Sequence, residues 1–162
     1  MIIKEANLSD VPKIADLWIE FMKEHDNIII NENPKLKEFE IKDNNRDGSY
    51  KEFLNSHMES KDGTVFIAEN NGEIVGYALI FIKDEIPIYK NKKIGCASDL
   101  YVKKNFRNKG ISSKLRDKSI EWFKEKGIKF LSTPMYPDNK FVHSLFKKWG
   151  FFDYKIEMRK KI

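Results

Sequence analysis

Residues Ser98 to Leu115 read Ser-Asp-Leu-Tyr-Val-Lys-Lys-Asn-Phe-Arg-Asn-Lys-Gly-Ile-Ser-Ser-Lys-Leu, a pattern typical of a β-strand, a glycine-containing turn and the start of a helix. The first N–H groups of such a helix have no partner within it, and the positive end of the helix dipole lies beside them. Arg107 and Lys109 add positive charge, Gly110 leaves the backbone open to close approach, and two serine hydroxyls follow. The sequence therefore predicts an anion site, for which diphosphate is the natural ligand.

Two common phosphate motifs do not fit this turn. A Walker A loop requires Gly, four residues and then Gly-Lys-Ser/Thr, and the dinucleotide fingerprint requires three glycines, whereas the turn contains only Gly110. The turn instead resembles the acyl-CoA site of the GNAT superfamily of N-acetyltransferases, whose pattern is Arg/Gln, two residues, Gly, one residue, Gly/Ala. Arg107 and Gly110 match this pattern, and Ser112 replaces its last small residue.

A second motif that resembles the same family lies downstream. Asn139 to Phe151 read Asn-Lys-Phe-Val-His-Ser-Leu-Phe-Lys-Lys-Trp-Gly-Phe, and the family's later helix runs Asn, two residues, Ala, then Leu-Tyr and Gly-Phe. Val142 replaces the alanine and Phe146 replaces the tyrosine. Because two motifs occur in the right order and spacing, the resemblance extends over most of the chain, from Ile2 to about Met158.

The remaining patterns predict a single α+β domain over residues 1–162, with a mixed sheet of six to seven strands flanked by about four helices. Helices are expected from about Val11 to Met22, from Tyr50 to Met58, from Ile111 to Gly127 and from Asn139 to Gly150. Strands are expected at residues 2–6, 64–69, 73–81, 94–102 and 129–133, with one or two more between Phe151 and Arg159. Asn70-Asn71-Gly72 predicts a hairpin turn, and His25 to Ser49 predicts a long loop with one turn of helix.

The resemblance implies acetyl-CoA as the co-substrate and the GNAT fold as its scaffold. In that family the fourth and fifth strands separate at a bulge, and the pantetheine arm lies between them as a pseudo-strand. The residues expected at the cofactor are Leu100, Tyr101, Val102, Arg107, Asn108, Lys109, Gly110, Ile111, Ser112, Ser113, Asn139 and Phe146. Asn139 is expected to orient cofactor or substrate through its amide, with a plain helix N-cap as the alternative.

Acetyl transfer to an amine requires an acceptor for the amine proton, and Asp99 is the candidate base. It lies on the fourth strand, where relatives of this kind often place an acidic residue. An exposed carboxylate with a pKa of ~3.9 is a poor base, so this role requires burial that raises the pKa of Asp99. The alternative is that Asp99 faces away from the cleft and pairs with a lysine.

The group that protonates the leaving thiolate is the clearest departure from the family. The usual tyrosine is Phe146 here, and phenylalanine has no proton to donate. Tyr136 and Ser144 are the candidate substitutes, and His143 and Tyr154 are further possibilities. Since thiols have a pKa of ~8.5, a thiolate is a tolerable leaving group even without an acid.

Composition excludes several other classes of protein. A hydrophobic content of 41% over 162 residues is typical of a globular domain. No apolar run approaches the ~20 residues of a membrane span. The N-terminus lacks the layout of a signal peptide. A cytoplasmic location without membrane association is therefore expected. Cys96 is the single cysteine, so no internal disulfide forms, and the three histidines show no metal-binding spacing. No metal is expected.

Charge is distributed unevenly along the chain. Tyr101 to Lys129 contains ten Lys/Arg and three Asp/Glu, whereas Asp26 to Gly48 contains six acidic and four basic residues. The basic block suits polyanionic CoA, and the acidic segment would attract a cationic acceptor. No RNA-binding aromatic signature accompanies the basic block, so nucleic acid is not expected as a partner.

Three classes of function stay open on these grounds. The first is an acetyltransferase that acts on a small-molecule or peptide amine in a ternary complex, as a monomer or homodimer. The second is an acyl-CoA-binding sensor without catalysis, which the phenylalanine at position 146 favours. The third is a basic nucleic-acid module.

Overall fold

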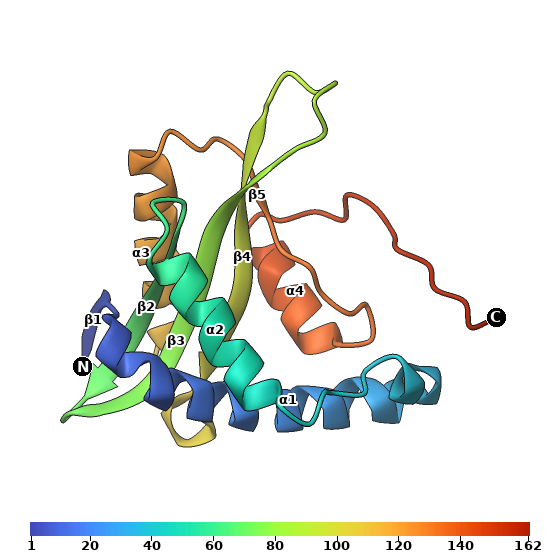
Figure 1. The fold of residues 1–162 in the computed structure, drawn as a ribbon, viewed down its shortest axis with the longest axis horizontal. Helices are drawn as coiled ribbons and strands as arrows, with labels where there is room; N and C mark the ends of the chain where they lie inside the picture. Colours follow the sequence, from blue (N-terminus) through green and yellow to red (C-terminus); the bar gives the residue numbers. More distant parts are fainter.

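Five strands form one mixed sheet in the order β1-β2-β3-β4-β5 in the computed structural model, which describes residues 1–162 (Figure 1). The strands are β1 (Ile2–Glu5), β2 (Gly63–Asn70), β3 (Glu73–Asp84), β4 (Lys93–Val102) and β5 (Leu131–Ser132). The first four strands pair antiparallel, and β5 pairs parallel to β4. Asn71 and Gly72, with φ angles of 51° and 82°, form the tight turn between β2 and β3. The predicted hairpin is therefore confirmed.

Helices cover both faces of the sheet. They are α1 (Val11–Glu32), α2 (Arg46–Met58), α3 (Ile111–Glu125) and α4 (Lys140–Lys148), with 3-10 turns η1 (Leu8–Asp10), η2 (Pro34–Glu38) and η3 (Lys104–Phe106). Figure 1 shows α1 and α2 in front of the sheet, α3 behind it and α4 beside β5. No helix combines the length and the apolar composition that a membrane crossing requires.

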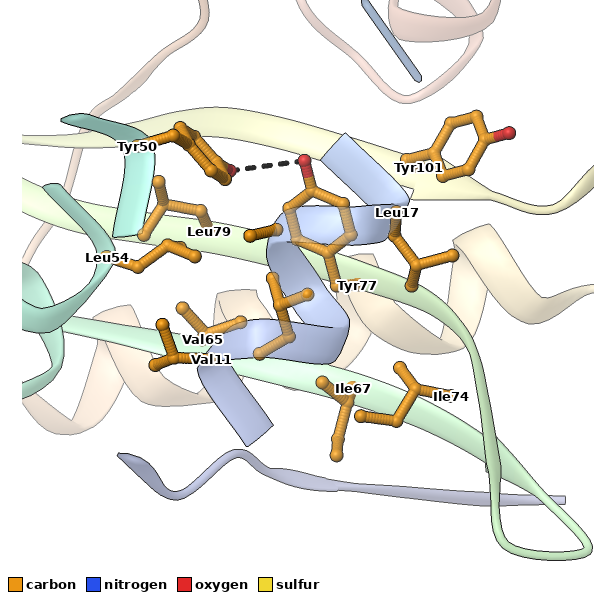
Figure 2. Packing of buried hydrophobic residues seen from close by; sticks show 12 residues of the cluster. Val11, Leu17, Tyr50, Leu54, Val65, Ile67, Ile74, Tyr77, Leu79 and Tyr101 are labelled. Carbon is orange, nitrogen blue, oxygen red and sulfur yellow. Dashed lines mark hydrogen bonds between the residues drawn. The ribbon is translucent and has the colours of Figure 1, made fainter. Parts of the chain in front are cut away.

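Strand residues alternate between two cores, as the pleat requires. Val65, Ile67, Tyr77 and Leu79 pack against α1 and α2 (Figure 2). Their neighbours in sequence face α3, where Leu115 and Phe123 complete the second core. In β4 the alternation is interrupted between Ala97 and Asp99, where the register with β3 shifts, so these two residues lie on opposite sides of the sheet.

The loop predicted from His25 to Ser49 is wrong in its first part, because α1 continues to Glu32. The Asn-Ile-Ile-Ile run at residues 27–30 has weak helix propensity, but Ile29 is completely buried, and this packing outweighs the local preference. Pro34 then follows the end of the helix and begins η2. α2 also begins earlier than expected, at Arg46.

The strands predicted between Phe151 and Arg159 are absent, so the sheet has five strands rather than six or seven. The segment alternates apolar and charged residues as a strand would, yet its apolar side chains are exposed: Phe152, Tyr154, Ile156 and Met158. β5 has two residues and is soon followed by Pro134 and Pro137, which lack N–H donors. β5 therefore offers no long edge with which this segment could pair.

Candidate active site

A gap opens between β4 and β5. The two strands pair only at Gly95 with Leu131 and at Cys96 with Ser132, whereas β3 follows β4 along its whole length. The β4 register shifts near its middle, where Leu79 faces Asp99 and Ile80 faces Ala97, so that Ser98 is the extra residue of a β-bulge. Beyond Cys96 one edge of β4 therefore has no partner strand. This is the separation that the family resemblance implied.

The glycine turn lies directly after β4 and η3. Asn108 and Gly110 both adopt left-handed conformations, with φ angles of 62° and 74°, and α3 begins at Ile111. No side chain caps this helix, and the hydrogen bond from the Lys114 N–H to the Gly110 carbonyl is the first of its turn. A Cβ on Gly110 would meet no atom within 4 Å. The N–H groups of residues 111–113 have no partner within the helix, and a helix N-terminus of this kind fits a diphosphate.

Arg107 fixes this turn to the rest of the molecule. Its Nε donates to the Val102 carbonyl over 2.8 Å, and its Nη2 donates to Glu24 of α1 over 2.6 Å. Burial of the Glu24 carboxyl opposes its ionisation, but the hydrogen bonds from Arg107 and Tyr101 outweigh burial and lower the pKa of Glu24. The Arg107 guanidinium is therefore directed toward α1, and the backbone N–H groups are left to contact an anion.

The second motif places its residues around the N-terminus and inner face of α4. Asn139 is buried, and its side-chain oxygen accepts a hydrogen bond from the Val142 N–H over 3.3 Å, so the helix N-cap alternative is present. Phe146 is buried against the rings of Trp149 and Phe151. The Phe146 ring therefore packs against α4 and the residue that follows it, and it offers no proton donor.

Asp99 lies on the side of β4 that faces α1 and α2. Its Oδ2 accepts hydrogen bonds from Tyr50 over 2.5 Å and from Tyr77 over 3.2 Å, and its Oδ1 accepts one from Ser98 over 3.3 Å. Burial raises the pKa of the Asp99 carboxyl above its ordinary value, and these three hydrogen bonds oppose that rise. The partners of Asp99 are thus hydroxyl groups, and the pairing with a lysine that the sequence left open is absent.

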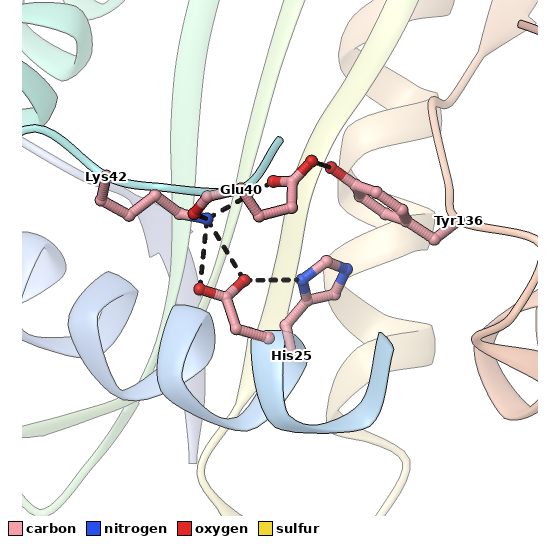
Figure 3. Close-up of polar contacts among 5 residues, drawn as sticks. His25, Glu40, Lys42 and Tyr136 are labelled. Atoms are coloured by element: carbon pink, nitrogen blue, oxygen red, sulfur yellow. Dashed lines mark hydrogen bonds and ion pairs between the residues drawn. The ribbon is translucent and has the colours of Figure 1, made fainter. Parts of the chain in front are cut away.

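A second polar cluster joins α1 to the segment that follows β5 (Figure 3). The Tyr136 hydroxyl donates to Glu40 over 2.5 Å, and Lys42 contacts both Glu40 at 3.4 Å and Asp26 at 3.1 Å. The His25 ring meets the Tyr136 ring edge-on, with 5.0 Å between the ring centres. Burial, followed by the contact with Glu40, raises the pKa of Tyr136. Among the predicted acid candidates, Tyr136 is the one held beside α1.

The other acid candidates lie on exposed parts of the C-terminal region. The Ser144 hydroxyl donates to the Phe141 carbonyl of its own helix. His143 pairs with Asp153 at 2.6 Å, and Tyr154 is 73% exposed. None of these side chains contacts Asp99 or its hydroxyl partners.

The acidic segment is partly neutralised by local contacts. Glu38 pairs with Lys161 at 2.6 Å, Glu40 has the contacts described above, and Asp43 accepts a hydrogen bond from the Asn45 N–H over 2.7 Å.

No group of three or more His, Cys, Asp or Glu side chains is arranged to hold a metal ion.

Sequence reasoning missed Tyr50, Tyr77, Glu24 and His25 as site residues. The predicted helix from Tyr50 to Met58 includes Tyr50, and the structure buries its ring, but the sequence could not show where its hydroxyl points. The contact between Tyr77 and Asp99 depends on the register of β3 with β4. A buried tyrosine that must satisfy its hydroxyl was the only available signal.

Comparison with known proteins agrees with this architecture. The Acetyltransferase (GNAT) family matches residues 22–151. An uncharacterised N-acetyltransferase, YhfO of Bacillus subtilis, is 25% identical over 154 residues, which are 93% of this chain and 89% of that protein.

Two solved structures show the same fold. A predicted acetyltransferase from Clostridium acetobutylicum, solved with acetyl-CoA, has a TM-score of 0.74 at 21% identity and covers 99% of this chain and 95% of its own. The aminoglycoside N-acetyltransferase AAC(6')-Iy, solved with CoA, has a TM-score of 0.74 at 16% identity, with coverage of 99% and 93%. The chain belongs to the GNAT family and is an acetyltransferase.

Proposed function

We propose that this enzyme transfers the acetyl group of acetyl-CoA to a primary amine of a small molecule, by direct attack within a ternary complex. The observation that carries the proposal is the position of Asp99, a half-buried carboxyl with a raised pKa beside the partnerless edge of β4. The two solved neighbours with CoA or acetyl-CoA support the co-substrate. The name of AAC(6')-Iy, an aminoglycoside N-acetyltransferase, supports a small-molecule acceptor over a peptide.

In this mechanism the N–H groups at the start of α3 bind the diphosphate, and the free edge of β4 orients the pantetheine amides. Acetyl-CoA supplies the thioester. A lysine-like amine is neutral in only about one of 2,500 molecules at pH 7, which costs ~4.6 kcal/mol, so a proton acceptor accelerates attack. Asp99 takes that proton as the new C–N bond forms and the C–S bond breaks. The thiolate leaves and takes a proton from Tyr136 or from water.

Phe146 favours one alternative, an acyl-CoA sensor without catalysis. It lies where the family usually has a tyrosine, and its buried ring cannot donate a proton. General-acid assistance is worth ~10² to 10⁴ in rate, so its loss slows a transferase without abolishing transfer. The second alternative, a nucleic-acid module, has only the basic block of sequence in its favour.

The deciding experiment measures thiol release from acetyl-CoA across small amines, polyamines, amino acids and peptide N-termini. We expect release with small-molecule amines, and we expect Asp99→Asn to lower kcat/KM by ~10² or more. Binding of acetyl-CoA, measured by its effect on Tm, should stay near the wild-type value in this variant.

Two results would contradict the proposal. Binding of acetyl-CoA without thiol release across the whole panel would identify a sensor. Unchanged activity and pH dependence in Asp99→Asn would make Asp99 a structural residue and leave the proton acceptor to be found elsewhere.

A further inference from the structure

We propose that Tyr50 of α2 is the positioning residue for Asp99: its hydroxyl holds one carboxylate oxygen and directs the other to the acceptor amine. This inference deepens the proposed function and rests on its assignment of Asp99 as the base. Tyr50 does not contact the reacting atoms in this proposal, and it acts through the carboxylate alone.

The hydrogen bonds of Asp99 are unequally divided between its two oxygens. Oδ2 lies 2.5 Å from the Tyr50 hydroxyl and 3.2 Å from that of Tyr77, whereas Oδ1 has only the longer contact of 3.3 Å with Ser98. The Tyr50 contact is short, as expected for an O–H donor to a charged oxygen. Oδ1 is therefore the oxygen with acceptor capacity left for a substrate N–H.

Tyr50 is held rigidly enough to fix a carboxylate. Its ring stacks on Trp18 of α1 with 4.2 Å between ring centres and 10° between planes, and Tyr50 is 7% exposed. Its hydroxyl also lies 3.2 Å from that of Tyr77, which is completely buried on β3 (Figure 2). A helix residue, Tyr50 of α2, and a strand residue, Tyr77 of β3, thus contact the same oxygen of Asp99.

The ionisation of the Asp99 carboxyl depends on the groups that face it from neighbouring elements. Tyr50 comes from α2, Tyr77 from β3 and His25 from α1, and Cys96 lies on β4 itself. The tyrosine hydroxyls and His25 all favour the ionised carboxylate, and burial opposes it. Tyr50 is the first of the favourable contacts, because its hydrogen bond is the shortest.

Loss of the Tyr50 hydroxyl should therefore change the pKa of Asp99 in a known direction. The carboxylate loses a donor that stabilised its charged form, so the pKa of Asp99 rises. A hydrogen bond to a charged group is worth about one to two pKa units in a buried site. The acid limb of the kcat/KM profile should accordingly move to higher pH by at least about one unit in Tyr50→Phe.

The experiment compares wild type, Tyr50→Phe and a matched control, Thr64→Val. Thr64 is a buried residue of β2 whose hydroxyl donates to the Glu5 carboxylate over 2.5 Å, away from the gap. The readouts are the pH profile of kcat/KM and a carboxyl ¹³C NMR titration, in which the Asp99 signal is assigned by its loss in Asp99→Asn. Tyr77→Phe, which removes the longer contact, provides a second variant if Tyr50→Phe does not fold.

We expect both the kinetic limb and the Asp99 titration to move upward in Tyr50→Phe, less so in Tyr77→Phe, and not in Thr64→Val. An unchanged Asp99 titration in the tyrosine variants would overturn the inference. A shifted titration with an unmoved kinetic profile would overturn it as well, because Tyr50 would then set the charge of a carboxyl that is not the base. The Asp99→Asn variant separates that outcome, since its retained activity would refute the proposed base itself.

Discussion

Gly110 combines two properties that a diphosphate site requires. Its φ of 74° lies in the left-handed region, and the backbone is open at this position, because a Cβ there would meet no atom within 4 Å. Gly72 has the same two properties, with a φ of 82° and no atom within 4 Å of where a Cβ would lie, but it belongs to the turn between β2 and β3. The two glycines therefore differ in place and not in backbone conformation.

Gly110 and Gly72 therefore form a matched pair for a controlled test of where acetyl-CoA binds. Gly110→Val and Gly72→Val should each lose about 1 to 2 kcal/mol of folding stability, because both force a branched side chain into the left-handed region. Wild type and Gly72→Val should gain ~2.7 kcal/mol at a hundredfold excess of acetyl-CoA over Kd, and Gly110→Val should gain nothing. Thermal unfolding with and without acetyl-CoA measures this gain. An equal gain in both variants would place the cofactor away from the turn.

Single residues differ in how far sequence could predict their roles. The turn at Gly110 was predictable because it is local, and the strand that carries Asp99 was predicted over residues 94–102, while the family resemblance implied an acidic residue on it. The hydroxyl partners of Asp99 were not, since they depend on how α2 packs on the sheet and on the bulge at Ser98. Contacts across 22 and 49 residues of sequence leave no local pattern.

Local propensity mispredicted two elements, the end of α1 and the C-terminal segment from Phe151 to Arg159. The isoleucine run in α1 has the weak helix propensity of a loop, yet burial of Ile29 keeps it helical to Glu32. That extra length brings His25 to the Tyr136 ring and Asp26 to its ion pair with Lys42 (Figure 3). The alternating C-terminal segment failed in the opposite sense, because a strand needs a partner edge and β5 does not supply one.

Truncation of the C-terminal segment tests whether it contributes to the stability of the fold. Removal of residues 155–162 keeps Asp153 with its contacts to His143 and Lys147, and it breaks the ion pair between Lys161 and Glu38. That pair is exposed, and surface pairs contribute at most about 1 kcal/mol. We therefore expect the free energy of unfolding in denaturant to change by no more than about 1 kcal/mol. Loss of cooperative unfolding in the shortened chain would show instead that this segment belongs to the sheet.

The sheet that contains the β4–β5 gap is covered by α1 and α2 on one face and by α3 on the other. No side chain caps the N-terminus of α3, and α1 and α2 cover the face on which Asp99 lies. The chain carries a formal net charge of +5, with ten basic and three acidic residues between Tyr101 and Lys129. A polyanionic co-substrate therefore approaches a positive region, whatever the local contacts of Arg107.

This charge distribution predicts a salt dependence for the co-substrate. The screening length falls from about 10 Å at 0.1 M salt to about 3 Å at 1 M, so the long-range attraction between the basic block and CoA phosphates should weaken across that range. We expect the Kd of acetyl-CoA, measured by calorimetry, to rise severalfold between about 0.05 and 0.5 M NaCl. S-acetylpantetheine, which has the thioester and amides but no diphosphate, is the matched control, and its Kd should not change. Equal salt responses for the two ligands would mean that the basic block does not contribute to binding, and that the N–H groups and the edge of β4 carry recognition alone.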